Sequence, residues 1–231
     1  MIIETIASSS AGCCYLIKSE GEQLLIECGI SLKKIREALN FDLSRVVGCL
    51  ISHEHKDHCK AIQDLSKKTI IELHAPDRVF DGVYRGGVAR TIPRMKFTCG
   101  EKFLVTAVSL THDTECFGYI IQSSNDILFY ATDTCEVNYT IKGLTHLMIE
   151  ANYSLDDLFI SNMHKTVVAR VFENHLSIAD ALVFAKRHQE TLKEVHLIHL
   201  SDAHSNEELF KHLAEESLGV PIYISPKGVL K

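Results

Sequence analysis

A wholly apolar segment that runs directly into a cluster of histidines constrains this sequence more than any other feature. Residues 46–51 read VVGCLI and are followed at once by Ser52-His-Glu-His-Lys-Asp-His58. A short segment with no polar position is typical of a strand that is covered on both faces. The chain must therefore build layers on both sides of this strand, and it presents the polar cluster where the strand ends.

The rest of the chain changes from strand-rich to strand–helix alternation. Ser31 can cap a helix that runs to about Leu39, a helix is predicted over 59–65, and capping boxes beginning at Ser177 and Ser205 predict two more. Further strands are predicted at 14–17, 23–27, 69–73, 103–110, 117–122, 127–131, 144–149 and 195–200. This order of elements predicts an α/β sandwich in which helices cover sheets, formed by one domain over residues 1–231.

Composition limits the location and the partners of the protein. The chain has 231 residues and a net charge of −6, and no basic stripe stands out. This argues against a long nucleic acid as the main partner but leaves a small anion possible. The sequence also lacks an apolar stretch of membrane-spanning length and a signal peptide, which predicts a cytoplasmic protein, or a protein of the host cytoplasm if a phage encodes it.

Eight cysteines occur without a CxxC pair, and we expect them to be buried, reduced thiols that pack as small apolar groups.

The cluster has the ligand spacing of a metal site. Side chains two residues apart on extended backbone point the same way, so His53 and His55 can meet on one cation. Asp57 and His58 follow where the chain turns into the next helix, and they can face a second cation beside the first. Imidazole and carboxylate groups suit zinc, manganese or iron.

A site for two cations needs more ligands than this cluster supplies. The candidates are His112, Asp133 and His199, because each of them follows an apolar segment that predicts a strand. Functional groups gather in loops at strand ends, so we expect these three residues to lie near the cluster.

These motifs occur in an order that resembles the metallo-β-lactamase superfamily over nearly the whole length of the chain. They are SSSAGCCYLI, LLIECG, SHEHKDH, THD, ATDT, EANY, NHLS and LIHLS, with LLIECG in place of the commoner L-I-D-C-G. The resemblance implies a four-layer αββα sandwich with two metal ions. The EANY and NHLS motifs resemble the phosphodiesterase branch, which includes tRNase Z, the WalJ-type nucleases and the phage anti-Pycsar cyclic-nucleotide phosphodiesterases.

The same resemblance implies a role for each candidate residue. It implies two divalent ions, Zn²⁺ first and Mn²⁺ as the alternative, with a hydroxide between them as the nucleophile, which Asp57 can also orient. Glu150 and His175 correspond to the Glu–His pair of the branch, in which the histidine would protonate the leaving group. His175 could instead serve only as a neighbour of the helix cap at Ser177, and His204 could contact substrate or cap the last helix. The implied metal ligands are His53, His55 and His112 for one ion, Asp57, His58 and His199 for the other, and Asp133 as the bridge.

The resulting prediction is a metal-dependent phosphodiesterase that hydrolyses a small nucleotide, with a cyclic mononucleotide as the expected substrate. Only 20 residues separate His112 from Asp133, which leaves room for a strand hairpin and not for the tRNA-gripping arm of tRNase Z. A WalJ-type nuclease acting on DNA or RNA is the alternative. A catalytically idle binding domain would be expected to lack a metal ligand, and none of the expected ligands is missing. Lactamases, glyoxalases and sulfatases share the fold, but the Glu–His pair makes their chemistry a less favoured alternative.

Residues 77–94 are predicted to form a long surface loop near the site. The loop contains four arginines that can pair with phosphate and two aromatic residues that can stack on a base. These residues are Arg78, Arg85, Arg90, Arg94, Phe80 and Tyr84. By resemblance to related phosphodiesterases we expect a homodimer, and the loop could close its own site or that of the partner.

Overall fold

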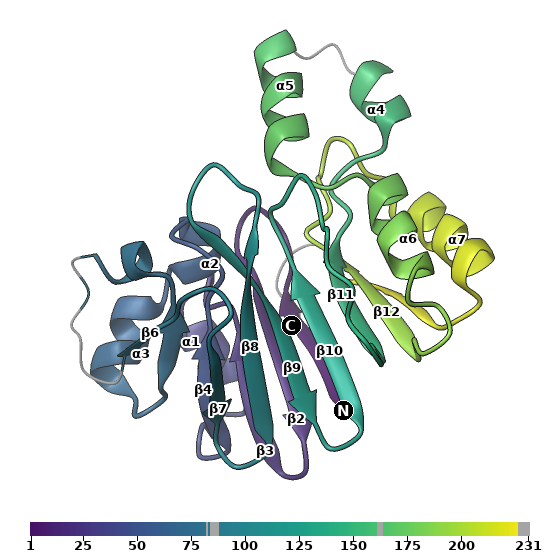
Figure 1. The fold of residues 1–231 in the computed structure, drawn as a ribbon. Helices are drawn as coiled ribbons and strands as arrows, with labels where there is room; N and C mark the ends of the chain where they lie inside the picture. Colours follow the sequence, from purple (N-terminus) through teal and green to yellow (C-terminus); the bar gives the residue numbers. More distant parts are fainter. Residues whose placement is uncertain (82, 84–87, 161–163, 226–231) are drawn as a thin grey trace.

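Two sheets face each other at the centre of the molecule (Figure 1). The computed structural model describes residues 1–81, 83, 88–160 and 164–225. The first sheet has the strand order β1 (Ile2–Ala7), β2 (Cys14–Ser19), β3 (Glu22–Ile26), β4 (Val46–Leu50), β5 (Leu73–Ala75) and β6 (Val88–Arg90). The second has the order β13 (Ile222–Ile224), β12 (Glu194–Ile198), β11 (His146–Glu150), β10 (Asp126–Ala131), β9 (Cys116–Ser123), β8 (Phe103–Leu110) and β7 (Lys96–Cys99).

Helices cover the outer face of each sheet, which confirms the predicted αββα sandwich. Helices α1 (Leu32–Ala38), α2 (Lys56–Cys59) and α3 (Ile62–Lys68) lie beside the first sheet, and α6 (Ile178–Lys186) and α7 (Glu207–Leu218) lie beside the second (Figure 1). The alternation along β3 shows how one strand serves two layers. Leu24 and Ile26 point into the core between the sheets, whereas Leu25 packs into the core under α1 and α3. The prediction that residues 1–231 form one domain stays a prediction.

Local sequence signals explain where the helices begin. Ser177 caps α6, because its hydroxyl accepts a hydrogen bond from Asp180 N at 3.1 Å, as the capping box predicts. Ser31 caps α1 in the same way. The prediction for α7 was wrong by one residue, since the side chain of Asn206, rather than Ser205, accepts from Leu209 N.

Several other predicted boundaries were wrong. In place of the helix predicted over 59–65 the chain has α2, which ends at Cys59, and α3, and the strand predicted at 69–73 is replaced by β5, which begins only at Leu73. Helices α4 (Leu155–Ile160) and α5 (Lys165–Asn174), which extend beyond the sheets in Figure 1, were not predicted. Helix α5 is mostly exposed, and its apolar residues Val167, Val168, Val171 and Phe172 recur at helical spacing, a signal that the prediction missed.

The predicted loop over 77–94 contains regular structure. A 3₁₀ turn, η1 (Asp77–Phe80), and strand β6 lie within it, and β6 extends the first sheet. Phe80 is buried in the core under α1 and α3, so the prediction that its ring stacks on a base was wrong. Arg78 and Arg90 are exposed and pair with Glu54 and Asp77. Tyr84, Arg85 and the glycines at 82, 86 and 87 lie outside the described residues.

Each described helix is too short or too polar to cross a lipid bilayer. The cytoplasmic location stays a prediction.

The direction of the strands determines where functional groups gather. Strands β10, β11 and β12 are parallel, and β8 runs in the same direction because β9 is antiparallel to both β8 and β10. Their carboxyl ends therefore lie along one edge of the second sheet. His112, Asp133 and His199 follow β8, β10 and β12 by one or two residues, and Glu150 is the last residue of β11.

Candidate metal centre

Three imidazoles from two sheets form the first group of potential ligands. His53 follows β4, His55 is the N-cap of α2, and His112 follows β8. His55 Nδ1 lies 3.0 Å from His53 Nε2 and 3.4 Å from His112 Nε2. Three ring nitrogens that converge in this way repel one another unless protons or a cation lie between them. The structure thus brings together the residues predicted to hold the first metal ion.

The second group adjoins the first and contains carboxylates. His58 Nε2 lies 3.5 Å from Asp57 Oδ2 and 3.1 Å from Asp133 Oδ2. His199 approaches from β12, with Nε2 at 3.8 Å from Asp57 Oδ2. Asp133 belongs to one possible ligand set with His53 and His58 and to another with His199, so it stands between the two groups as its predicted bridging role requires.

The chemistry of these residues fits divalent cations. Both ring nitrogens of His58, and Nε2 of His199, are buried and make no well-directed hydrogen bond among the described atoms, although carboxylates lie 3.1–3.8 Å from them. Buried polar atoms are almost always paired, so an unpaired set that converges with carboxylates calls for a ligand. Neutral imidazole and carboxylate together suit zinc or manganese.

A second layer of contacts orients the imidazoles of the first group. His53 Nδ1 lies 2.8 Å from Ser52 Oγ, and His112 Nδ1 lies 3.2 Å from the carbonyl oxygen of Asn174. A hydrogen bond at the outer nitrogen fixes which ring nitrogen keeps a lone pair for a metal. The ligand set is therefore preorganised by residues that the sequence alone did not single out.

Glu27 links several parts of this layer and was not predicted as a site residue. The carboxylate is fully buried, accepts hydrogen bonds from Ser52 N at 3.2 Å and Tyr130 Oη at 3.0 Å, and lies 3.4 Å from His58 Nδ1. The available signal was its position in LLIECG, where the family more commonly has aspartate. Glu27 thus reaches the histidine with one more methylene than the common residue would have.

Glu150 and His175 form a close pair beside both groups. His175 Nδ1 lies 2.7 Å from Glu150 Oε1 and 3.6 Å from Asp133 Oδ1. Glu150 is fully buried and its Oε1 also lies 3.0 Å from His199 Nδ1, whereas the side chain of His175 remains 23% exposed. The predicted pair is therefore assembled at the centre, with its histidine accessible to a substrate.

Electrostatics divide the histidines into two kinds. Burial lowers the pKa of His53 and His112, which favours neutral rings. Burial is the largest single influence on the pKa of His58 and His199 and acts to lower it, but Asp133 and the other acidic groups around each ring together outweigh burial and raise both pKa values. A cation bound by His58 and His199 must therefore displace protons.

The same balance raises the pKa of His175. Burial opposes the imidazolium form and is the largest single influence on the pKa, but the charge and the hydrogen bond of Glu150, together with the charge of Asp133, outweigh it. At neutral pH a larger fraction of His175 is therefore protonated than of an isolated histidine, so a proton is available for donation.

Three residues of the centre have backbone in the left-handed region. Glu27, Asp133 and His199 have φ values of +63°, +48° and +52°. Non-glycine residues adopt this conformation at a cost, and it is found where the fold places a functional side chain. The turns after β3, β10 and β12 thus aim these side chains toward one another.

The remaining histidines do not join the two groups of ligands. His204 is buried, and its Nδ1 lies 3.2 Å from Ser201 Oγ. Of its two predicted roles, capping of the last helix was wrong, since Asn206 is the cap, and contact with substrate stays a prediction. Six further histidines also lie outside these groups: His74, His146, His188 and His196 are buried, and His164 and His212 are exposed.

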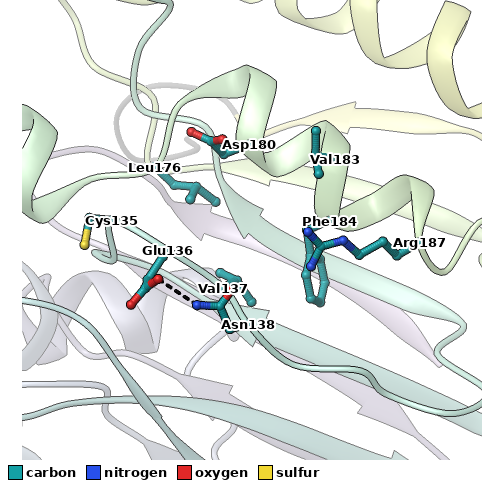
Figure 2. Close-up of a pocket in the computed structure, with 9 residues that line it drawn as sticks. All are labelled: Cys135, Glu136, Val137, Asn138, Leu176, Asp180, Val183, Phe184 and Arg187. Carbon is teal, nitrogen blue, oxygen red and sulfur yellow. Dashed lines mark hydrogen bonds between the residues drawn. The ribbon is translucent and has the colours of Figure 1, made fainter.

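A pocket of about 160 Å³ lies between residues 135–138 and α6 (Figure 2). Glu136, Asn138, Asp180 and Arg187 are among its lining residues. Sites for small molecules usually enclose roughly 300 Å³ or more. We therefore place the reaction at the converging histidines and carboxylates, not in this pocket.

An αββα sandwich with two adjoining groups of imidazole and carboxylate ligands at one edge defines a metal-dependent hydrolase. Residues 22–200 match the family described as "Beta-lactamase superfamily domain", and the chain belongs to this superfamily, whose metallo-β-lactamase members bind divalent metal ions. This confirms the predicted family, including its phosphodiesterase and nuclease branch.

Known relatives differ in how much of the chain they match. Exodeoxyribonuclease YycJ of Bacillus anthracis is 26% identical over 238 residues, which cover 93% of this chain and 90% of that protein. The anti-Pycsar protein Apyc1 of Bacillus phage 010DV004 is 42% identical over 48 residues, which cover 21% of this chain and 19% of that protein. The crystal structure of the metallo-β-lactamase fold protein YhfI from Bacillus subtilis has a TM-score of 0.74 at 19% identity and covers 98% of this chain and 97% of its own, which shows the shared fold.

Proposed function

We propose that this protein hydrolyses nucleotide phosphodiesters with two divalent cations, Zn²⁺ being the first choice and Mn²⁺ the alternative. The observation that carries the proposal is the position of the Glu150–His175 pair. The ring of His175 lies 6.1 Å from that of His112 and 5.6 Å from that of His199, centroid to centroid, so it stands beside both groups of ligands. Hydrolysis of a phosphodiester needs both an activated water and a proton for the leaving alkoxide, and these groups supply the two requirements side by side.

Different residues of this chain would hold the two cations and orient the attacking water. When bound, the cations would lower the pKa of water and neutralise charge on the phosphate. His53, His55 and His112 would hold one of them, and Asp57, His58 and His199 the other, with Asp133 shared. Asp57 would also orient the attacking water.

Two further side chains would act on the substrate. His175, kept protonated by Glu150, would donate its proton to the departing oxygen. Arg78 is exposed, and its Nη1 lies 3.8 Å from Oε1 of Glu54, the residue between His53 and His55. Its guanidinium would pair with a phosphate oxygen at the rim of the centre.

A cyclic mononucleotide is the substrate that we propose first. The net charge of −6 offers little attraction to a long polyanion. Strands β9 and β10 form a plain hairpin with a turn at Ser124 and Asn125, so the described chain between His112 and Asp133 has no arm to grip RNA. The local similarity to the anti-Pycsar protein Apyc1 adds support.

An exodeoxyribonuclease is the second candidate, and the extent of one similarity favours it. The match to exodeoxyribonuclease YycJ spans 93% of this chain, against 21% for the match to Apyc1. Both candidates require the same metal ligands and the same Glu–His pair.

A substrate panel separates the two candidates. The metal-loaded protein is incubated with bis-p-nitrophenyl phosphate, with a set of cyclic nucleotides and with single-stranded DNA, with metal-free protein as the blank. We expect hydrolysis of bis-p-nitrophenyl phosphate and of at least one cyclic nucleotide, with KM nearly constant between 50 and 200 mM salt. A nuclease that contacts about four phosphates of a single strand would lose roughly 50-fold in affinity over that range. Faster cleavage of DNA, with that salt dependence, would favour the second candidate, and no hydrolysis of any substrate would reject both.

We also propose that the protein acts as a homodimer, by the same resemblance to related phosphodiesterases. Leu155 on α4, and Val167 and Phe172 on α5, are partly exposed on helices that extend beyond the sheets. Light scattering of the full chain is expected to give twice the monomer mass of 25.9 kDa. Replacing Phe172 with lysine should shift the mass toward the monomer if α5 lies in the interface, whereas Tyr223→Lys, an exposed aromatic on β13, serves as the control. A monomer in the unmodified protein would contradict the proposal.

A further inference from the structure

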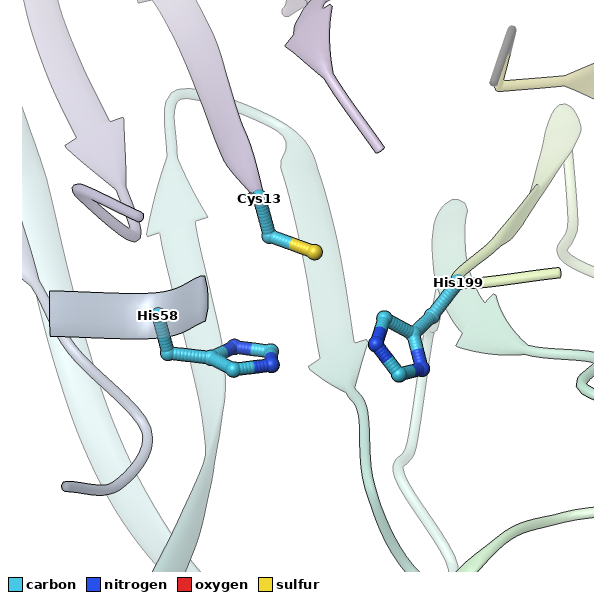
Figure 3. Close-up of side chains that lie close together, drawn as sticks. All are labelled: Cys13, His58 and His199. Atoms are coloured by element: carbon cyan, nitrogen blue, oxygen red, sulfur yellow. The ribbon is translucent and has the colours of Figure 1, made fainter. Parts of the chain in front are cut away.

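The thiol of Cys13 points into the space between two imidazoles of the second group (Figure 3). Cys13 immediately precedes β2 and is fully buried. Its sulfur, a ring nitrogen of His58 and a ring nitrogen of His199 all lie within 4.8 Å of one another. This is a separate possible ligand set from the ones that the sequence predicts, because it adds a sulfur from the segment before β2.

The imidazole nitrogens around this sulfur lie 3.1–3.8 Å from carboxylates but make no well-directed hydrogen bond that would explain their burial. The ring nitrogens of His58 and Nε2 of His199 are without hydrogen bonds among the described atoms. The contact recorded for Cys13 Sγ is a weak one of 3.6 Å with the carbonyl oxygen of Ser9. Several buried lone pairs directed at a common point are stabilised by a cation at that point.

The backbone holds Cys13 rigidly against the second group. Cys13 N donates to the carbonyl oxygen of Asp57 at 2.7 Å, and Gly29 N donates to that of Cys13 at 2.8 Å. A Cβ at Gly29 would lie 1.6 Å from the Asp57 oxygen, so this close approach requires glycine. The main chain that positions Asp57 thus also holds the main chain of Cys13 beside the second group.

Other buried cysteines lack this relation to the ligand atoms. Cys14 points to the opposite face of β2, into the core under α1 and α3. Cys116 Sγ lies 3.8 Å from His53 Nδ1, but that nitrogen is the outer one, which contacts Ser52 Oγ. Cys13 therefore departs from the expectation that all eight cysteines serve only as small apolar groups.

We infer that Cys13 is a thiolate ligand of the cation bound by His58 and His199, and that it makes this position selective for zinc over manganese. On binding, the S–H bond breaks, the proton passes to solvent, and the sulfur lone pair is donated to the cation. Thiolate ligands favour Zn²⁺ and Co²⁺, whereas Mn²⁺ prefers oxygen ligands. The inference rests on the metal centre of the proposed function, but it does not depend on the substrate.

Cobalt spectroscopy tests the inference without any activity assay. The metal-free protein is titrated with Co²⁺, whose bond to a thiolate gives an intense charge-transfer absorption in the near ultraviolet. We expect this band in the wild-type protein and its loss in Cys13→Ser and Cys13→Ala. The zinc affinity of both variants should fall by about 10–100-fold. Manganese affinity should change much less.

Two matched variants and one direct measurement complete the test. Cys14→Ser and Cys116→Ser are expected to keep the band, since neither sulfur faces the ligand nitrogens. X-ray absorption of the zinc-loaded wild-type protein is expected to show a sulfur neighbour at about 2.3 Å, and this measurement requires no variant to fold. Only nitrogen and oxygen neighbours, or a band that persists in both Cys13 variants, would overturn the inference. A sulfur neighbour in a protein that hydrolyses no phosphodiester would leave it standing and reject the proposed function instead.

Discussion

Replacing His53 or Asp133 with alanine is expected to remove at least one of the two proposed cations and to abolish hydrolysis. His53 Nε2 lies 3.0 Å from His55 Nδ1, so its loss would leave a gap in a set of three converging imidazoles. Asp133 carries the carboxylate placed between the two groups, and its Oδ2 lies 3.1 Å from His58 Nε2. Loss of an outer-shell partner alone typically costs 10–100-fold in metal affinity, and we expect losses of more than about 100-fold for these direct ligands.

Elemental analysis and hydrolysis of bis-p-nitrophenyl phosphate measure the two effects together. The wild-type protein should bind two ions per chain, and each variant should bind one or none. His212→Ala is the matched control, because this histidine is exposed on α7 and should keep both the ions and the rate. Asp133→Asn keeps the shape of the side chain and shows whether the negative charge is the required property. Full activity of a protein stripped of metal would contradict the assignment.

The convergence of the candidate metal ligands could be predicted from the sequence because they follow apolar strands. The spacing within His53–His58 indicates two pairs of ligands. The sheet order then brings the ends of the strands that precede His112, Asp133 and His199 to the same edge. The continuous apolar run Leu24-Leu25-Ile26 in β3 likewise predicts a strand that is buried on both faces. These features are local in sequence, and the fold follows from them.

Contacts made across the sandwich could not be predicted in this way. Glu27 reaches His58 and Ser52 from the end of β3, and Cys13 reaches His58 and His199 from the segment before β2. Neither residue has a spacing that marks it as part of the centre. Their roles depend on which side chains face each other between the two sheets, and a single sequence does not encode this as a local pattern. The same holds for Phe80, an aromatic in a polar segment that is buried by tertiary packing.

Replacing His175 with alanine is expected to slow hydrolysis without releasing metal. His175 Nδ1 donates to Glu150 Oε1 at 2.7 Å, and His175 is not among the predicted metal ligands, so both ions should remain. Loss of a general acid costs about 10²–10⁴-fold, and we expect this loss for substrates whose leaving group is an alkoxide. A p-nitrophenolate group leaves without help from an acid, so the rate with bis-p-nitrophenyl phosphate should fall much less.

The ratio of the two rates is the decisive quantity, because a damaged fold or a lost metal would lower both. His175→Gln keeps a hydrogen-bonding side chain but cannot transfer a proton at neutral pH, so it should reproduce the selective loss. His164→Ala is the control for disturbance of α5, since His164 caps the other end of this helix and lies outside the two groups of ligands. Equal losses on both kinds of substrate in the His175 variants would mean that this residue positions the phosphate or supports the end of α5 and that the proton comes from another group. A selective loss would show that His175 donates the proton to the leaving group, and it would support the role of the Glu150 carboxylate in keeping His175 protonated.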